Sequence, residues 1–130
     1  MEHQPLSEKE ELLAKQIVDA AFCVHKGLGP GLLESVYEVC FCHELRKRGL
    51  PFERQTPLAI RYDGLTFQEG YRLDVLVEDL IVCELKAVET LQPVHFAQIL
   101  TYLRCSGKRL GFLLNFNSAY IRHGIHRLIL

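Results

Sequence analysis

The feature that most constrains this chain is a pair of short apolar segments, 71–78 and 80–87, that meet at Asp79. Both alternate with the period of two that side chains follow along a β-strand. A single residue lies between them, so we predict two antiparallel neighbours in one sheet. Asp74 interrupts the first segment, and Glu84 and Lys86 interrupt the second. The fold must therefore bury these strands and still place charged groups beside its core.

The predicted hairpin determines which residues of its two strands face each other. With Asp79 at its centre, Asp74 lies opposite Glu84 and on the same face of the sheet. Their Cβ atoms would then be about 5 Å apart. Like charges at that distance destabilise a sheet, so the pair requires a cation, and a divalent ion with oxygen ligands such as Mg²⁺ is the natural candidate. From the residues alone, an ordinary ion-pair cluster with Lys86 explains the pattern equally well.

Turn and cap signals on either side of the hairpin fix the order of elements. Ser7 and Glu10 form a capping-box pattern ahead of one apolar stripe, and Pro93 opens another stripe that ends at Gly107. Asp63-Gly64 is a strong two-residue turn signal. The predicted elements are a helix at 7–25, a helix from Leu33 to a stop at Gly49, strands at 52–62, 65–78 and 80–87, a helix at 93–107 and a strand at 109–116. This order makes an α/β layer structure, with the tail from Asn117 to Leu130 left open.

Composition favours one domain over the whole chain, 1–130, with a flexible N-terminal end at 1–6. The 130 residues are 48% hydrophobic and 24% charged, enough apolar material for a core. The chain lacks a run of roughly 18 apolar residues, and its acidic N-terminus does not resemble a signal peptide, so we expect a cytoplasmic protein without a membrane partner. Five cysteines without a C-x-x-C pair favour buried reduced thiols over disulfides or zinc.

Charge is distributed unevenly along the chain. The net charge of −1 argues against a monomer that coats duplex DNA through bulk charge. Residues 61–90 hold seven acids and three bases, whereas 91–130 hold five bases and no acid. An acidic centre beside a basic segment suits a metal site next to an anion-binding surface, and solvated surface charge explains it as well. The basic segment suits either binding or the formation of a homodimer.

Two motifs resemble those of a known nuclease superfamily. Asp74, nine intervening residues and Glu84-Leu85-Lys86 resemble the PD-(D/E)XK signature. The run from Gly31 to Tyr37 is similar to the motif that names the GxxExxY protein family, a branch of that superfamily. The similarity covers nearly everything from about residue 15 to the end and includes Arg54-Gln55, Gly70 to Asp74, Glu84 to Glu89, Gln98 to Tyr102 and Asn115 to Asn117.

The resemblance implies a restriction-endonuclease-like core, with a central mixed sheet of about four strands flanked by helices in the order α-α-β-β-β-α-β. It implies that Asp74 and Glu84 are metal ligands, with the backbone carbonyl of Leu85 completing the coordination. Lys86 then orients or activates the attacking water, and Glu34 supplies a carboxylate from a helix.

A later helix is implied to flank the same site. Helical spacing puts His95, Gln98 and Tyr102 on one polar stripe that borders the apolar face. The resemblance implies that Gln98 and Tyr102 contact the site or its substrate. A satisfied buried amide and a core aromatic with its hydroxyl at the rim are equally good interpretations of these two residues.

The function implied by the resemblance is that of a phosphodiesterase that hydrolyses DNA or RNA with Mg²⁺, or Mn²⁺ in its place. Hard oxygen ligands hold these ions, which lower the pKa of a bound water and neutralise charge on a scissile phosphate. Two alternatives stay open. One is a non-catalytic module of the same fold that binds nucleic acid or a protein partner, and the other is a structural oligomer with a vestigial site.

Overall fold

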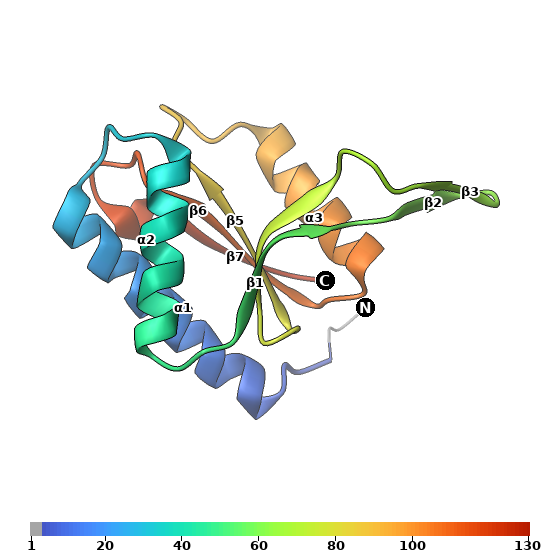
Figure 1. Ribbon diagram of the computed structural model, residues 1–130, viewed down its shortest axis with the longest axis horizontal. Coiled ribbons are helices and arrows are strands. Elements are labelled where there is room, and N and C mark those ends of the chain that lie inside the picture. The colour runs from blue at the N-terminus through green and yellow to red at the C-terminus, as the bar shows by residue number, and fades with distance from the viewer. Residues whose placement is uncertain (1–3) are drawn as a thin grey trace.

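A computed structural model describes residues 4–130 as a five-stranded mixed sheet with helices on both faces (Figure 1). The sheet order is β1-β4-β5-β6-β7, in which only β5 and β6 are parallel. This architecture confirms the α/β fold with a restriction-endonuclease-like core. The elements are α1 Glu8–Leu28, α2 Glu34–Lys47, β1 Phe52–Pro57, β2 Ile60–Tyr62, β3 Leu65–Phe67, β4 Arg72–Val77, β5 Ile81–Lys86, α3 Pro93–Ser106, β6 Leu110–Asn115, the 3₁₀ turn η1 Ile121–His123 and β7 Ile125–Ile129.

The helix boundaries follow the predicted caps. Ser7 and Glu10 make both bonds of the capping box at the start of α1, which continues to Leu28 rather than ending near residue 25. Pro93 opens α3, and Gly107 ends it in the left-handed conformation that glycine tolerates.

The two long strands predicted at 52–62 and 65–78 are wrong, because each divides in two. Leu58 turns into the core and its N–H donates to the carbonyl of Tyr71 at 2.9 Å. The chain therefore leaves the sheet after β1 and returns to it at β4. Between them, β2 and β3 form a separate two-stranded ribbon around the predicted turn, in which Asp63 and Gly64 both have positive φ values, 47° and 80°.

The tail from Asn117 to Leu130, for which the sequence predicted no structure, provides the fifth strand. After η1, β7 pairs antiparallel with β6, with Leu110 opposite Ile129 and Leu114 opposite Ile125. The predicted flexible end at 1–6 falls partly outside the described residues and stays a prediction. Within the part described, the Pro5 carbonyl accepts a hydrogen bond from Arg109 Nη1 at 3.0 Å.

Two apolar clusters fill the space on either side of the sheet. The larger cluster packs α1 and α2 against Ile81, Cys83 and Leu85, and the smaller one packs α3 against Leu76 and Val82. The five cysteines are free, but only Cys42 and Cys83 are buried and Cys23 is exposed, so the expectation of buried thiols is wrong for Cys23. Among the described residues, no helix combines the length and apolarity needed to cross a membrane.

Candidate active site

The β4–β5 hairpin has the register predicted from the sequence. Val75 pairs with Cys83 and Val77 with Ile81, and the same alignment continued by one residue past the last pair places Asp74 across from Glu84. The strands are joined by three turn residues, 78–80, and the Leu80 N–H donates to the Val77 carbonyl at 2.9 Å. An odd number of turn residues keeps the paired residues of the two strands on the same face of the sheet.

Beyond the Val75–Cys83 pair, side chains make the bonds between the two strands. The Asp74 N–H donates to Glu84 Oε2 at 2.8 Å, and the Leu85 N–H donates to Asp74 Oδ2 at 2.9 Å. Each carboxylate is therefore held by the backbone of the opposite strand. The alternation of β4 also breaks here, since Leu73 packs in the smaller cluster instead of sharing a face with Val75, as its position predicts.

Burial governs the ionisation of this pair. Only 2% of Glu84 is exposed, and this burial raises the pKa of its carboxyl to about 8, with a further contribution from the negative charge of Asp74. Burial also raises the pKa of Asp74, which the hydrogen bond from the Leu85 N–H opposes. Glu84 thus keeps its proton at a pH where exposed carboxyls have lost theirs.

Lys86 links β5 to α3 through two residues of the predicted polar stripe. Lys86 Nζ donates to Gln98 Oε1 at 3.2 Å, and Gln98 Nε2 donates to Tyr102 Oη at 3.1 Å. Burial raises the pKa of Tyr102, so its hydroxyl stays protonated. His95 serves a different purpose, because its Nδ1 accepts from the Gln92 N–H at 2.8 Å and caps α3.

Glu34 is the first residue of α2 and lies near the same end of the hairpin. Partial burial raises the pKa of its carboxyl, the negative charge of Asp74 raises it further, and Lys86 lowers it. The structure therefore brings Glu34, Asp74, Glu84 and Lys86 to one region, as the resemblance implies. Their roles in catalysis stay predictions.

The remainder of the Gly31–Tyr37 motif fixes the start of α2. Tyr37 is buried, its hydroxyl donates to the Gly29 carbonyl at 2.6 Å, and its ring stacks on Phe116 with centroids 4.9 Å apart. The Gly31 N–H donates to Asn117 Oδ1 at 3.0 Å, with φ at 101°, a conformation that favours glycine. The loop that carries Glu34 is therefore fastened to the residues after β6.

Asn115 fastens the other side of the site. Its Nδ2 donates to the Val88 carbonyl at 2.9 Å, and its Oδ1 accepts from the Val88 N–H at 3.1 Å. These two bonds hold the chain just beyond Lys86 against the end of β6.

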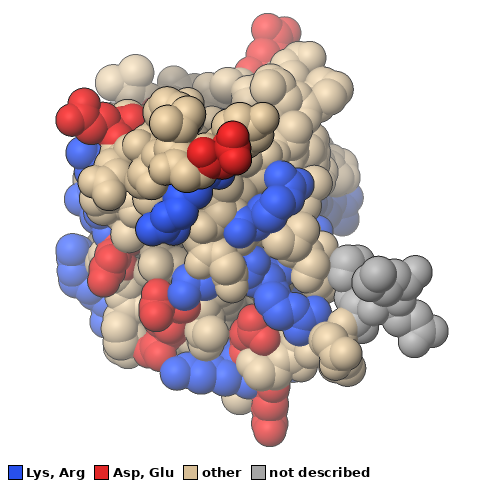
Figure 2. Space-filling model, turned by 90° about the vertical axis from the view of Figure 1, so that its right-hand side faces the viewer, with Lys and Arg blue, Asp and Glu red and all other residues tan. Residues whose placement is uncertain are grey.

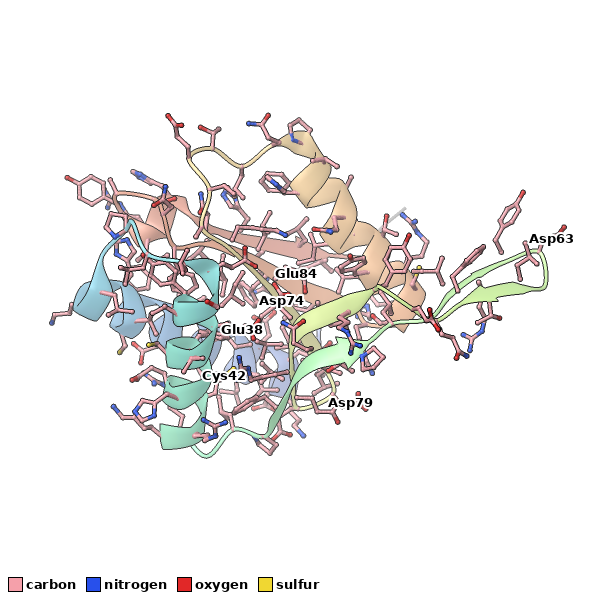
Figure 3. The ribbon with its side chains drawn as sticks, turned by 45° about the horizontal axis from the view of Figure 1, so that its top comes forward. Glu38, Cys42, Asp63, Asp74, Asp79 and Glu84 are labelled. Carbon is pink, nitrogen blue, oxygen red and sulfur yellow. The ribbon has the colours of Figure 1, made fainter. Side chains whose placement is uncertain are left out.

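Sequence reasoning missed Glu38, the most closely held carboxylate near the site. It lies one helical turn after Glu34, it is buried, and its Oε2 accepts from Arg54 Nη2 at 2.8 Å while its Oε1 accepts from Gln55 Nε2 at 2.8 Å. In Figure 3, Glu38, Asp74 and Glu84 lie on a line that runs from α2 across the sheet toward α3. The four-residue spacing of two glutamates on one helix face was the available signal.

The donor atoms near the hairpin end suit a hard divalent ion. Among residues 4–130, no three His, Cys, Asp or Glu side chains already converge as a complete metal cage. Mg²⁺ does not require one, because it is commonly bound by one or two carboxylates, with waters and substrate phosphates supplying the other oxygens. Asp74, Glu84 and the Leu85 carbonyl stay the predicted ligands.

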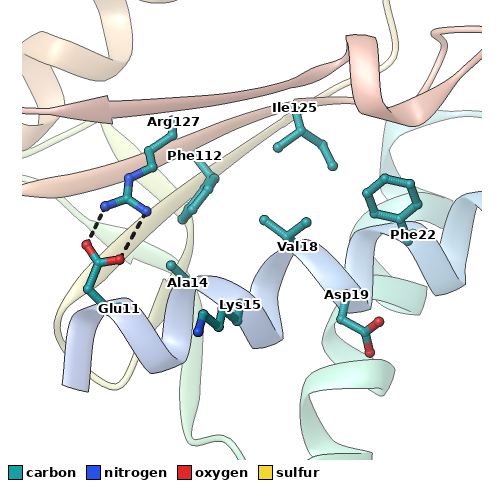
Figure 4. A pocket seen from close by; sticks show the side chains of 9 residues that line it. All are labelled: Glu11, Ala14, Lys15, Val18, Asp19, Phe22, Phe112, Ile125 and Arg127. Carbon is teal, nitrogen blue, oxygen red and sulfur yellow. Dashed lines mark hydrogen bonds and ion pairs between the residues drawn. The ribbon is translucent and has the colours of Figure 1, made fainter. Parts of the chain in front are cut away.

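A surface groove of about 530 Å³ runs beside α3 and reaches this site. Its lining includes Lys86, Gln98 and Tyr102, together with Tyr71 and His95. A second hollow of about 480 Å³ lies on the opposite side of the sheet, between α1 and the strands β6 and β7, where Arg127 pairs with Glu11 at 2.5 Å (Figure 4). Only the groove beside α3 contains Lys86, so it is the approach to the candidate site.

Comparison with known protein families gives one match, in which residues 11–128 match the model described as the PD-(D/E)XK nuclease superfamily. Searches of curated proteins and of solved structures found no match to this chain. Assignment to the GxxExxY branch stays a prediction.

Proposed function

Because this chain belongs to the PD-(D/E)XK nuclease superfamily, we propose that it is a metal-dependent phosphodiesterase that hydrolyses DNA or RNA with Mg²⁺ or Mn²⁺. One observation carries the proposal. Asp74 and Glu84 are bonded across the end of the β4–β5 hairpin, and Lys86 follows on the same strand within reach of the groove. Cytoplasmic location and assembly as a homodimer stay predictions from the sequence.

In this proposal Asp74, Glu84 and the Leu85 carbonyl hold the cation, and Glu34 adds a carboxylate from α2. When bound, the cation lowers the pKa of a water and neutralises charge on the scissile phosphate. Lys86 Nζ adds positive charge beside that phosphate or orients the water that attacks it. Gln98 supports this role because it holds Lys86 at 3.2 Å and is itself bonded to Tyr102.

A second candidate function is a module of the same fold that binds nucleic acid or a protein partner without cleaving it. The observation that favours it is that each carboxylate of the pair already has a backbone N–H partner, Leu85 for Asp74 and Asp74 for Glu84. The hairpin end is therefore held together by the chain itself.

The test is cleavage of single-stranded and double-stranded DNA and RNA by the purified protein with Mg²⁺, Mn²⁺ or EDTA. Lys86→Ala should lower the metal-dependent rate by roughly 100-fold or more, since one preorganised charged group contributes about that much to such a site. Lys15→Ala is the matched control, because Lys15 lines the hollow on the opposite side of the sheet. Thermal melts establish that both variants fold.

Cleavage that survives Lys86→Ala, or that separates from the protein during purification, contradicts this mechanism. Inactivity on all four substrates with either metal favours the binding module.

A further inference from the structure

The ribbon formed by β2 and β3, called the arm here and covering residues 60–67, projects away from the rest of the molecule (Figure 1). Ile60 pairs with Phe67 and Tyr62 with Leu65, and paired residues of an antiparallel ribbon point to the same side. These four side chains therefore form one apolar face, and Arg61 lies on the other.

Most of that apolar face is open to solvent. Tyr62 is 72% exposed, Leu65 58% and Phe67 50%. Only Ile60, at the base, packs against the smaller apolar cluster, to which Tyr102 of α3 belongs. The apolar face of the arm thus begins at the smaller cluster, on the α3 side of the sheet, and extends outward into solvent.

The base of the arm also borders the groove that reaches the candidate site. Tyr71, which follows the arm, lines this groove together with Lys86 and Tyr102. A chain that lies in the groove next to Lys86 therefore continues past Tyr71 toward the aromatic residues of the arm. The groove thus lies next to the base of the arm, with Tyr71 between them.

The arm presents two exposed aromatic rings, those of Tyr62 and Phe67, on which a planar base can stack. Tyr62 and Phe67 are diagonal neighbours in the ribbon, a relation that separates side chains by about 7–8 Å. Aromatic rings stack on any base whose face is free, and duplex pairing leaves those faces covered.

We propose that the arm stacks unpaired nucleobases, which makes single-stranded DNA or RNA the substrate class of the groove. The inference rests on the proposed function, since it uses the groove beside Lys86 as the path of the strand. Positive charge is available for the phosphates from Arg72, at the base of the arm, and from Lys86 in the groove. Figure 2, which views the molecule from the side to which the arm projects, shows Lys and Arg side chains gathered over the middle of that face among scattered acidic ones.

The test is fluorescence anisotropy of a labelled oligothymidylate strand and of a duplex of equal length, in EDTA so that binding is measured without cleavage. The parent should bind the single strand more tightly than the duplex. The double variant Tyr62→Ala/Phe67→Ala should lose at least about fivefold in single-strand affinity, the smallest effect expected from one lost stacking contact. The matched control is Tyr120→Ala, because Tyr120 is 66% exposed and lies beside η1, outside the arm and the groove lining.

Three results overturn the proposal: no single-strand binding by the parent, tighter binding to the duplex, or equal single-strand affinity in the parent and the arm variant. Sedimentation of the same proteins adds a separate outcome. If the arm substitutions change the oligomeric state and leave DNA affinity unchanged, the apolar face is an interface between copies of this chain. Because binding is measured without metal, the result for the arm can be interpreted even if the parent protein cleaves no substrate.

Discussion

The two hairpins of this protein differ in what surrounds them. Both turn through residues with positive φ values, Glu78 and Asp79 between β4 and β5, and Asp63 and Gly64 between β2 and β3. The first hairpin lies in the sheet between two apolar clusters, and the second is a ribbon of three-residue strands outside the sheet. Residues that favour a turn thus produce a hairpin in both places. The two differ in burial: the buried hairpin holds carboxylates in place, and the exposed one presents aromatic rings to solvent.

The largest expected difference between the two hairpins is in packing energy. Ile81→Ala removes a fully buried side chain from β5 and should lower the free energy of unfolding by about 2–5 kcal/mol. Leu65→Ala in the arm should change it by less than about 0.5 kcal/mol, because Leu65 is exposed. Urea denaturation of both variants measures the contrast. Equal losses would show that the arm is as integral to the fold as the sheet.

The next largest expected difference between the two hairpins is in their response to metal. Mn²⁺ at about 100 times its dissociation constant should raise parent stability by roughly 2.7 kcal/mol, and Asp74→Asn should lose most of this gain. Without metal, and above about pH 8 where Glu84 is also ionised, Asp74→Asn should be as stable as the parent or more so, since it removes a like-charge contact and its amide oxygen still accepts from the Leu85 N–H. Thermal melts in EDTA and across a Mn²⁺ series measure both effects.

Asp63→Asn in the arm is the control for that experiment and should respond to Mn²⁺ like the parent. An ordinary ion-pair cluster predicts the reverse pattern, in which Asp74→Asn destabilises the metal-free protein and the parent is insensitive to metal. That pattern would reject the assignment of Asp74 as a ligand.

The pH dependence of stability should also come from the buried hairpin. The folded-state pKa of Glu84 is raised to about 8 by burial, so between its ordinary value of 4.5 and that value the native state binds more protons than the unfolded chain. Its contribution to stability is complete below pH 4.5 and is lost as the pH rises toward 8. The slope for one proton is at most about 1.4 kcal/mol per pH unit.

Glu84→Gln should flatten the pH dependence between pH 4.5 and 8. Urea denaturation of the parent and the variant in EDTA, at several pH values, measures it. An unchanged slope in the variant would assign the pH dependence to another group.

The smallest expected effect is at the tip of the arm. Gly64 has a φ of 80°, which an alanine adopts at a cost of about 1–2 kcal/mol, and open space surrounds the position of a Cβ there. Gly64→Ala should nevertheless lower global stability by less than about 0.5 kcal/mol, because the arm can open without unfolding the sheet. Amide hydrogen exchange should become faster in residues 60–67 and stay unchanged in β5.

The features that were predicted correctly from the sequence are those encoded by local patterns. The alignment of β4 with β5 about Asp79 follows from the alternation of their residues, and the ends of α1 and α3 follow from their caps. These features need no knowledge of distant contacts, and the motif around Glu34 is likewise contained in seven consecutive residues.

The features that sequence reasoning missed depend on contacts between distant segments. β1 ends at Pro57 because Leu58 finds a buried position and a bond to Tyr71, which no local pattern encodes. β7 becomes a strand by pairing with β6. Glu38 is buried because two residues of β1 neutralise and hold it, and a helix sequence alone does not reveal such partners.

The parallel pairing of β5 with β6 has a consequence for the newly made chain. Ile81 pairs with Leu110, 29 residues later in the sequence. At translation rates of about 5–20 residues per second, β5 waits roughly 1.5–6 seconds for its neighbour, and during this time its apolar edge is a template for misplaced strands. Phe116 and Asn117, which fasten the loop before Glu34, emerge later still. A chain that has emerged from the ribosome only as far as residue 109 therefore displays the carboxylate hairpin with an open flank and an unfastened α2.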